Sequence, residues 1–336
     1  MLALGLVTLG AVGSAAAADG DPAVLSLSGP TSVVDEQTGR LSVTWTGTNG
    51  LPISATVSIY ASVGGAAWTF VSSTRTDVLG QARFAVTPRF TTTYQARGEA
   101  GPGWDAATSA NRTVVNVPPL SRVVLPRRAP RPTALPAQRR AVGAGANAVV
   151  NLISDATWAR MVGRSWRAGC PVGRTSLRYV QVNYWGFDGY RHRGELVVRA
   201  TAASRFALAL TNLYDARIRI RAMYLPDRFG YSRRSRGADD YASMRHDNTS
   251  AFNCRVVTGG HGTRSPHAYG TAIDLNPFEN PFHSEHGWLP NRWWVSHRAG
   301  NYTWRSSSAQ VVRIMRSSGF TWTYRMSDSQ HFDTRP

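Results

Sequence analysis

Residues 265–276 read Ser265-Pro-His267-Ala-Tyr-Gly270-Thr-Ala-Ile-Asp274-Leu-Asn, which places a histidine and an aspartate on either side of a glycine. A neutral imidazole and a carboxylate are both good zinc ligands, and a catalytic zinc has three protein ligands and one position open for water. A turn at Gly270 lets the chain fold back, so that the two side chains converge. The stretch therefore predicts two of the three protein ligands of one metal site.

The third ligand has to come from another part of the chain. The C-terminal run Asp328-Ser-Gln-His331 is a candidate, because one of its two side chains can bind metal while the other faces a metal-bound water. A rival cluster is formed by His283, Glu285 and His286. Its spacing differs from the helical His-Glu-x-x-His pattern, which directs two imidazoles at one ion, so we expect a solvated surface loop there.

Together the two motifs resemble the VanY-like D-alanyl-D-alanine carboxypeptidases, within the group that also holds VanX-type dipeptidases and L-alanyl-D-glutamate endolysins. That group carries S-x-H-x-x-G-x-A-x-D, matched at every fixed position by residues 265–274, and a downstream acid-x-x-His. The resemblance extends over most of residues 160–333. It implies an α+β zinc peptidase domain of the hedgehog/D-Ala-D-Ala peptidase type at residues 151–336.

The resemblance also implies roles for single residues. His267, Asp274 and His331 would hold Zn²⁺. Asp328 would be the general base and acid, taking a proton from water and returning it to the leaving amine. Ser265 would hydrogen-bond the substrate, although a serine that caps a turn explains the same residue equally well.

An arginine should stabilise the oxyanion or hold a substrate carboxylate, because a guanidinium offers forked donors in a fixed geometry. Arg255 and Arg221 are the two candidates. For Arg255 a purely structural ion pair is the alternative.

Residues 19–117 alternate apolar and polar positions in short runs that are broken by Gly, Pro, Asn and Thr. Seven short strands at this spacing predict an immunoglobulin-like or fibronectin-like β-sandwich, with Trp45 and Tyr94 in its core. The expected strands are Ala23–Ser28, Leu41–Thr46, Ala55–Ala61, Trp68–Ser73, Ala82–Thr87, Thr92–Gly98 and Thr113–Val117.

Residues 118–150 are rich in proline, and residues 119–150 carry six arginines and no acidic residue. Such a segment lacks the apolar side chains for a core, and proline keeps it extended. We therefore expect a basic, semi-stiff and solvated linker between the two domains, with an anion-binding role as the alternative.

Residues 151–336 mix helix and strand patterns. Alternation predicts strands at 195–200 and 217–224, and apolar residues at helical spacing predict a helix over 203–214. A second helix is expected around 311–315, stopped by Gly319 and followed by a strand at 320–324.

Residues 1–18 combine a short apolar run with a small-residue cleavage pattern, so we expect a signal peptide and a secreted or wall-associated protein. In an oxidising compartment Cys170 and Cys254, the only cysteines, should form a disulfide, with two buried thiols as the alternative. The net charge is +18, and all of the basic residues counted are arginines. Outside a cell, such a charge favours adsorption to anionic wall polymers.

The most favoured function is therefore a secreted zinc peptidase that acts on peptidoglycan stem peptides as a D-Ala-D-Ala carboxypeptidase, and we expect a monomer. An L-Ala-D-Glu endopeptidase is the first alternative. A non-catalytic, zinc-containing wall-binding protein is the second, but retention of Asp328 argues against it. An extracellular nucleic-acid binder rests on charge alone, without any nucleic-acid fold signature, so we expect no specific nucleic acid as a partner.

Overall fold

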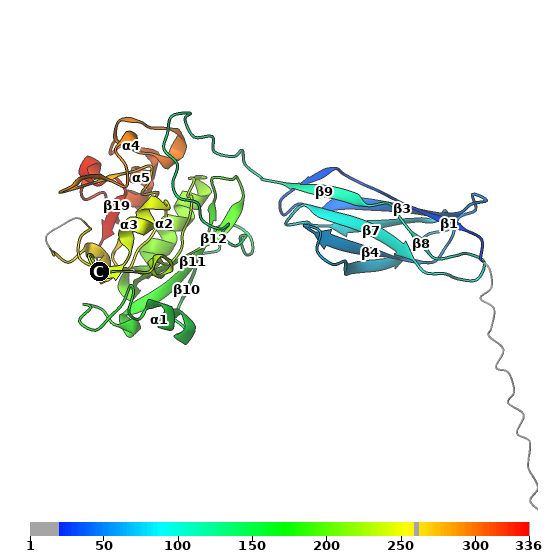
Figure 1. Cartoon of the computed structure of the whole chain (residues 1–336), viewed down its shortest axis with the longest axis horizontal. Coiled ribbons are helices and arrows are strands. Elements are labelled where there is room, and N and C mark those ends of the chain that lie inside the picture. Colours follow the sequence, from blue (N-terminus) through cyan, green and yellow to red (C-terminus); the bar gives the residue numbers. More distant parts are fainter. Residues whose placement is uncertain (1–19, 259–261, 336) are drawn as a thin grey trace, which may run out of the picture. The chain divides into compact units, whose positions relative to one another are not determined.

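The structure is a computed structural model that describes residues 20–258 and 262–335. The expected signal peptide, residues 1–18, lies outside these ranges. The chain divides into two compact units, Met1–Pro119 and Leu120–Pro336 (Figure 1). No helix in the described ranges is long and apolar enough to span a bilayer.

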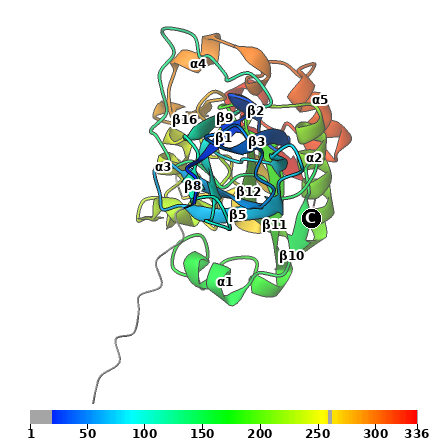
Figure 2. The same cartoon turned by 90° about the vertical axis from the view of Figure 1, so that its right-hand side faces the viewer.

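The first unit is all β and has two sheets, as Figures 1 and 2 show. Each of the seven expected runs forms a strand. The first sheet has the order β1 (Ala23–Ser28), β3 (Gly39–Gly47), β6 (Gln81–Val86). The second has the order β2 (Ser32–Val34), β9 (Arg112–Val117), β7 (Thr92–Gly98), β4 (Thr56–Val63), β5 (Thr69–Arg75), with β8 (Ala107–Thr108) paired to β7.

Alternating side chains of both sheets form one apolar core. Trp45 is fully buried there, and Tyr94 is also buried, so both are core residues as expected. Backbone packs closely on the Trp45 ring, because a Cβ atom at Gly98 would lie 2.4 Å from it.

The second unit contains an antiparallel sheet in the order β10 (Val149–Asn151), β11 (Leu177–Trp185), β12 (Arg191–Arg199). Helix α2 (Ala203–Asp215) contacts β11, and its buried side chains include Phe206, Leu210 and Leu213. The expected helix over 203–214 is thus present, and all of the expected strand over 195–200 except Ala200 is part of β12.

A second antiparallel sheet of this unit has the order β15 (Ala272–Asp274), β19 (His331–Thr334), β18 (Phe320–Thr321). Helix α5 (Gln310–Ser317) ends before Gly319, as its sequence predicts. The other elements are α1 (Asp155–Met161), α3 (Asp240–Arg245), α4 (Trp293–Ser296), the hairpins β13 (Tyr231–Ser232) with β14 (Gly237–Ala238) and β16 (Phe282–Ser284) with β17 (Gly287–Leu289), and the 3-10 turns η1 (Arg174–Ser176), η2 (Ala200–Ala202), η3 (Pro226–Phe229), η4 (Pro266–Tyr269), η5 (Gly300–Tyr302), η6 (Arg325–Ser327).

Two strand predictions need correction. Residues 217–224 make only isolated bridges, such as Trp185 with Arg219, and therefore form no strand. Their alternation has another origin, since Ile218 and Ile220 are buried on one side of an extended segment. The strand expected at 320–324 is short, because β18 ends at Thr321.

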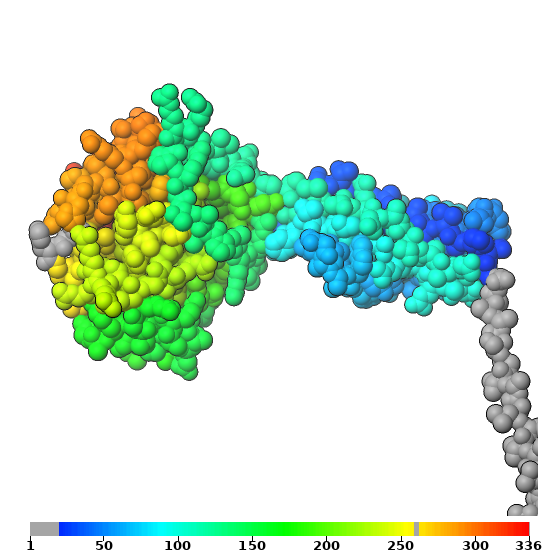
Figure 3. Space-filling model, in the orientation of Figure 1, coloured from blue at the N-terminus to red at the C-terminus, as the bar shows by residue number. Residues whose placement is uncertain are grey.

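The basic, proline-rich residues 120–148, here called the Pro/Arg segment, differ from the expected solvated linker. They belong to the second unit and lie against its surface (Figure 3). Single backbone hydrogen bonds join the segment to this surface, for example from Val123 N to Phe187 O at 2.7 Å and from Thr133 N to Arg245 O at 2.9 Å. Proline lacks a backbone N–H and disfavours a regular ladder within the segment, and several of its other backbone donors pair with neighbouring strands and loops instead.

Cys170 and Cys254 form the expected disulfide bond, with a Cα–Cα distance of 5.9 Å. The bond ties the loop between α1 and η1 to the segment that leads toward Ser265 and His267. Both ends pack in one apolar cluster with Met161, so the bridge is part of a core.

Candidate active site

Local structure brings His267, Asp274 and His331 together, and we call these three residues the triad. Ser265 caps the turn η4, because its hydroxyl accepts a hydrogen bond from His267 N at 3.3 Å. Gly270 ends that turn with a φ of +71°, a conformation that favours glycine, and the chain then enters β15. Asp274 pairs with His331 across β15 and β19.

The nitrogen and oxygen atoms of the triad face one another. The Nε2 atom of His267 lies 3.0 Å from Oδ2 of Asp274, and the Nδ1 atom of His331 lies 3.0 Å from Oδ1 of the same carboxylate. One ligand atom from each residue falls within 4.8 Å of the other two, and all three residues are buried. Two imidazoles and a carboxylate at this spacing could hold one metal ion.

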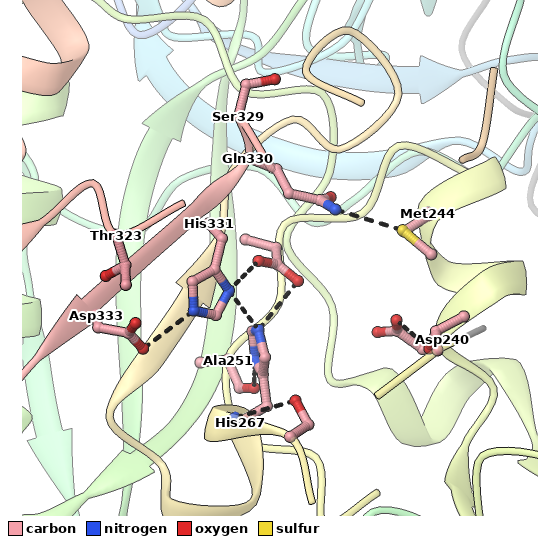
Figure 4. A network of polar contacts seen from close by, with 12 residues as sticks. Asp240, Met244, Ala251, His267, Thr323, Ser329, Gln330, His331 and Asp333 are labelled. Carbon is pink, nitrogen blue, oxygen red and sulfur yellow. Dashed lines mark hydrogen bonds and ion pairs between the residues drawn. The ribbon is translucent and has the colours of Figure 1, made fainter. Parts of the chain in front are cut away.

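Second contacts orient both imidazoles (Figure 4). The Nδ1 atom of His267 lies 2.6 Å from the carbonyl oxygen of Ala251, and the Nε2 atom of His331 lies 3.0 Å from Oδ1 of Asp333. Because each outer partner accepts a hydrogen bond, the outer nitrogen carries a proton, and the inner nitrogen is the one that can bind a metal when the imidazole is neutral. This is the arrangement that histidine ligands of metal sites adopt.

Electrostatics favour charge separation within the triad. Burial alone would raise the pKa of Asp274, but His267 and His331 hold that pKa below its usual range. Burial opposes a proton on His331, yet the carboxylates of Asp274 and Asp333 raise the pKa of this imidazole well above its usual value. A site with two carboxylates around one imidazole attracts a cation, either a proton or a metal ion.

The triad opens into a cavity of about 290 Å³, here called the triad pocket. Its volume suits a short peptide segment more than a large ligand. The wall is formed by Asp240, Met244, Arg255, Val257, Thr258, Ser265, Pro266, His267, Asp274, Phe282, His283, Tyr324, Ser327, Asp328, Gln330 and His331.

Asp328 follows the turn η6 and lines the triad pocket beside His331. Burial, opposed by His331 and reinforced by the negative charge of Asp274, raises the pKa of Asp328 to about 8. Its Oδ1 atom is buried, and within the described ranges no group donates a hydrogen bond to it. An acid with such a pKa and an unused oxygen can exchange a proton with a molecule in the pocket.

Arg255 also lines the triad pocket, and its guanidinium is buried. Its Nη2 atom forms an ion pair with Oδ2 of Asp240 at 2.8 Å. The Nε atom is buried and has no acceptor among the described residues. Arg255 therefore forms a structural ion pair and also lies in the pocket wall, so the two roles considered from the sequence are compatible. The turn-capping role of Ser265 is likewise compatible with its place in the wall.

Arg221 is not brought to the triad. Its Nε atom contacts Oδ2 of Asp247 at 2.7 Å and its Nη2 atom contacts Oε1 of Glu279 at 2.7 Å. The guanidinium lies over the ring of Phe187, 4.1 Å from its centroid, and the residue lines a different cavity. The structure therefore places Arg221 away from the triad, with its Nε and Nη2 atoms paired to two buried carboxylates, and this position does not suit the expected catalytic role.

The rival cluster does not converge either. His283 packs on Trp288 in the β16–β17 hairpin, whereas Nε2 of His286 lies 2.8 Å from the guanidinium of Arg234. Within the part of the chain that the structure describes, the triad is the group of His, Cys, Asp and Glu residues with ligand atoms close enough for one metal.

Sequence reasoning missed three contributors to the site. Asp333 had a usable signal, because residues two apart in a strand share a face, and His331 is two positions before it. Asp240 could be found only through its contact with Arg255. The carbonyl of Ala251 gave no signal, since any residue provides the same atom.

Residues 258–334 match the family described as D-alanyl-D-alanine carboxypeptidase. The matched range contains the triad and Asp328, so this part of the second unit is similar to a peptidase family. No curated protein matches the chain in sequence. Among solved structures, the sulfur carrier protein SoxY from Chlorobium limicola f thiosulfatophilum is similar over 27% of this chain and 73% of its own, at 15% identity and a TM-score of 0.21, which carries no argument.

Proposed function

We propose that this chain is a secreted, zinc-dependent peptidase that hydrolyses peptidoglycan stem peptides as a D-Ala-D-Ala carboxypeptidase of the VanY-like branch. The observation that supports it most is a buried set of two imidazoles and one carboxylate beside a buried carboxylic acid, in a pocket of peptide size. The family match over the same residues supports a peptidase reaction.

The donor set of the triad suits zinc. Two imidazoles and a carboxylate are a donor set typical of catalytic zinc sites, which keep a fourth position for water or substrate. His267 Nε2, one oxygen of Asp274 and His331 Nδ1 are the atoms that would hold the ion. When bound, zinc supplies Lewis acidity that lowers the pKa of water and polarises a peptide carbonyl.

Asp328 is the residue that moves protons. With a cation held by the triad, the pKa of Asp328 would fall below the value near 8, because opposite charge favours the carboxylate. The carboxylate then takes a proton from the attacking water on Oδ1, and as the peptide bond breaks it returns this proton to the leaving amine. Among the described residues, no hydrogen bond to Oδ1 competes with the substrate for this oxygen.

Arg255 and Ser265 are proposed to position the substrate. The ion pair with Asp240 fixes the Arg255 guanidinium, and the unused Nε–H remains as a donor for a substrate carboxylate or the oxyanion. The hydroxyl of Ser265 lies in the same wall next to His267. A free carboxylate one residue beyond the cut bond is what distinguishes a carboxypeptidase substrate.

We also propose the context in which the reaction takes place. The disulfide is typical of an oxidising compartment, which supports secretion and a signal peptide at residues 1–18. The all-β first unit is proposed to be an immunoglobulin-like spacer or wall-targeting module, and the arginine-rich surface to adsorb anionic wall polymers. We propose that the protein acts as a monomer.

The test is to incubate the zinc-loaded protein with a muramyl pentapeptide and to weigh the products. Loss of one alanine is the expected result. Release of the tetrapeptide that begins at D-Glu would reassign the protein as an L-Ala-D-Glu endopeptidase. An intact pentapeptide after incubation with fully zinc-loaded protein would leave a non-catalytic wall-binding protein and overturn the proposal.

A further inference from the structure

A second and larger cavity lies between the Pro/Arg segment and the rest of the second unit. Its volume is about 650 Å³, within the range of sites that bind small organic molecules. It shares no lining residue with the triad pocket. Asp240 and Met244 of α3 line the triad pocket, whereas His246, which directly follows α3, lines the second cavity.

The cavity is held in shape by the contacts of the Pro/Arg segment. Gln138 donates from Nε2 to Met223 O at 2.5 Å and accepts from Met223 N at 2.9 Å. The carbonyl oxygen of Gln138 lies 3.0 Å from Nδ1 of His192. With Val123 and Thr133 also bonded to the surface beneath, the segment is anchored along its length, so the cavity is formed before any ligand arrives.

The lining has excess positive charge. Three arginines and two histidines line the cavity against a single acidic residue, Asp188. That aspartate lies 3.0 Å from Nε2 of His192, and Arg221 is neutralised by its own carboxylate partners. Arg122 and Arg131 are the other two arginines of the lining. Both are exposed at the edge of the cavity, and in the described ranges neither forms an ion pair with an acidic side chain.

The remaining lining is largely apolar, with Leu125 and Leu135 from the Pro/Arg segment facing Phe187 and Tyr224. A ligand that suits both the two arginines and the apolar lining has a negatively charged group attached to a small aliphatic group. A phosphate offers oxygens to two guanidinium groups at once, whereas one guanidinium fork already satisfies both oxygens of a carboxylate.

We propose that this cavity binds a small organic phosphate, namely a phosphodiester unit with a glycerol-sized body. The same chemistry occurs in a phosphodiester polymer of the wall and in an anionic lipid headgroup. The proposal does not depend on peptidase activity, because the cavity is separate from the triad pocket. It gives the general adsorption to anionic polymers a defined site.

The experiment measures binding of the full chain to soluble poly(glycerol phosphate) and, in a second arm, to phosphatidylglycerol vesicles. The double variant R122Q/R131Q should weaken binding about tenfold or more, which corresponds to the loss of charge-assisted hydrogen bonds. The matched control is R127Q/R128Q, which removes the same charge from exposed arginines of the same segment outside the cavity. Its affinity should stay within about twofold of the parent.

A second variant, Ala134→Trp, fills the cavity without changing its charge and should also weaken binding. Equal losses in R122Q/R131Q and R127Q/R128Q, or full binding by Ala134→Trp, would show general charge attraction and overturn the proposal. Absence of binding by the parent chain would overturn it as well. Binding to the polymer but not to vesicles identifies the wall polymer as source, and the reverse identifies lipid. R122Q/R131Q should hydrolyse stem peptides at the same rate as the parent chain. Peptidase activity and ligand binding are thus measured independently, and failure of one proposal can be told from failure of the other.

Discussion

The Nε2 atom of His331 lies 3.0 Å from Oδ1 of Asp333, on the side of the imidazole that faces away from Asp274. This contact fixes which nitrogen carries the proton and so prepares Nδ1 as a ligand. Asp333→Asn keeps the size of the side chain but removes the charge. We expect zinc affinity to fall by roughly 10- to 100-fold, measured by competition with a chelator.

The control for this substitution is Asp155→Asn, a change of an exposed aspartate in the first turn of α1. It should leave zinc affinity unchanged. Parent-like affinity in Asp333→Asn would mean that the contact does not orient a ligand.

Gly270 is needed for the turn that joins His267 to Asp274. Its φ is +71°, and an added Cβ would lie 2.7 Å from the backbone nitrogen of Arg199. Gly270→Ala should therefore cost more than the roughly 1–2 kcal/mol of left-handed strain alone and should reduce zinc content. Gly163→Ala is the matched control, since φ there is +81° and nothing lies within 4 Å. Equal thermal stability and equal zinc content of the two variants would contradict this account of the turn.

Much of the site was predictable because its chemistry lies in short motifs. Spacing around Gly270 indicated two ligands, and the Asp328 to His331 run supplied the third and a proton carrier. In the first unit, alternation marked each longer strand. Strands of two or three residues, such as β8, contain too few positions for alternation to be recognised.

What sequence could not give depends on long-range contacts. Arg221 and Arg255 look alike as sequence, and only the fold assigns one to Asp247 and Glu279 and the other to the pocket wall. The Pro/Arg segment has the composition of a tether, yet donors such as Val123 N find acceptors on the neighbouring surface. Composition indicates whether a segment can form a core of its own, but it does not predict which other part of the chain the segment packs against.

Zinc binding should release protons. Without metal, burial disfavours the proton on His331, but Asp274 and Asp333 raise the pKa of the imidazole well above its usual value. A ligand must be deprotonated, so zinc competes with this proton below the raised pKa. Affinity should rise as pH increases from about 6 to about 8, by up to tenfold per unit where one proton is displaced. Calorimetry in buffers of different ionisation enthalpy counts the protons, and a pH-independent affinity would refute the competition.

The disulfide should contribute to stability through the unfolded chain. It joins residues that are 84 positions apart, and the entropy that closing such a loop removes from the unfolded chain corresponds to roughly 4.5 kcal/mol at 25 °C. The double variant Cys170→Ser/Cys254→Ser should unfold at lower denaturant concentration, followed by tryptophan fluorescence on metal-free protein. An unchanged midpoint, or two free thiols in the mass map of secreted protein, would rule out the bridge as a stabilising element.

The central claim is that the triad holds the metal while Asp328 moves protons. The most direct measurement is zinc content and stem-peptide turnover in two purified variants, Asp328→Asn and His267→Ala. We expect Asp328→Asn to keep zinc and lose hydrolysis by about 100-fold or more, since an amide cannot take the proton. His267→Ala should lose both zinc and activity. Near-normal turnover in Asp328→Asn, or full zinc content in His267→Ala, would contradict the account.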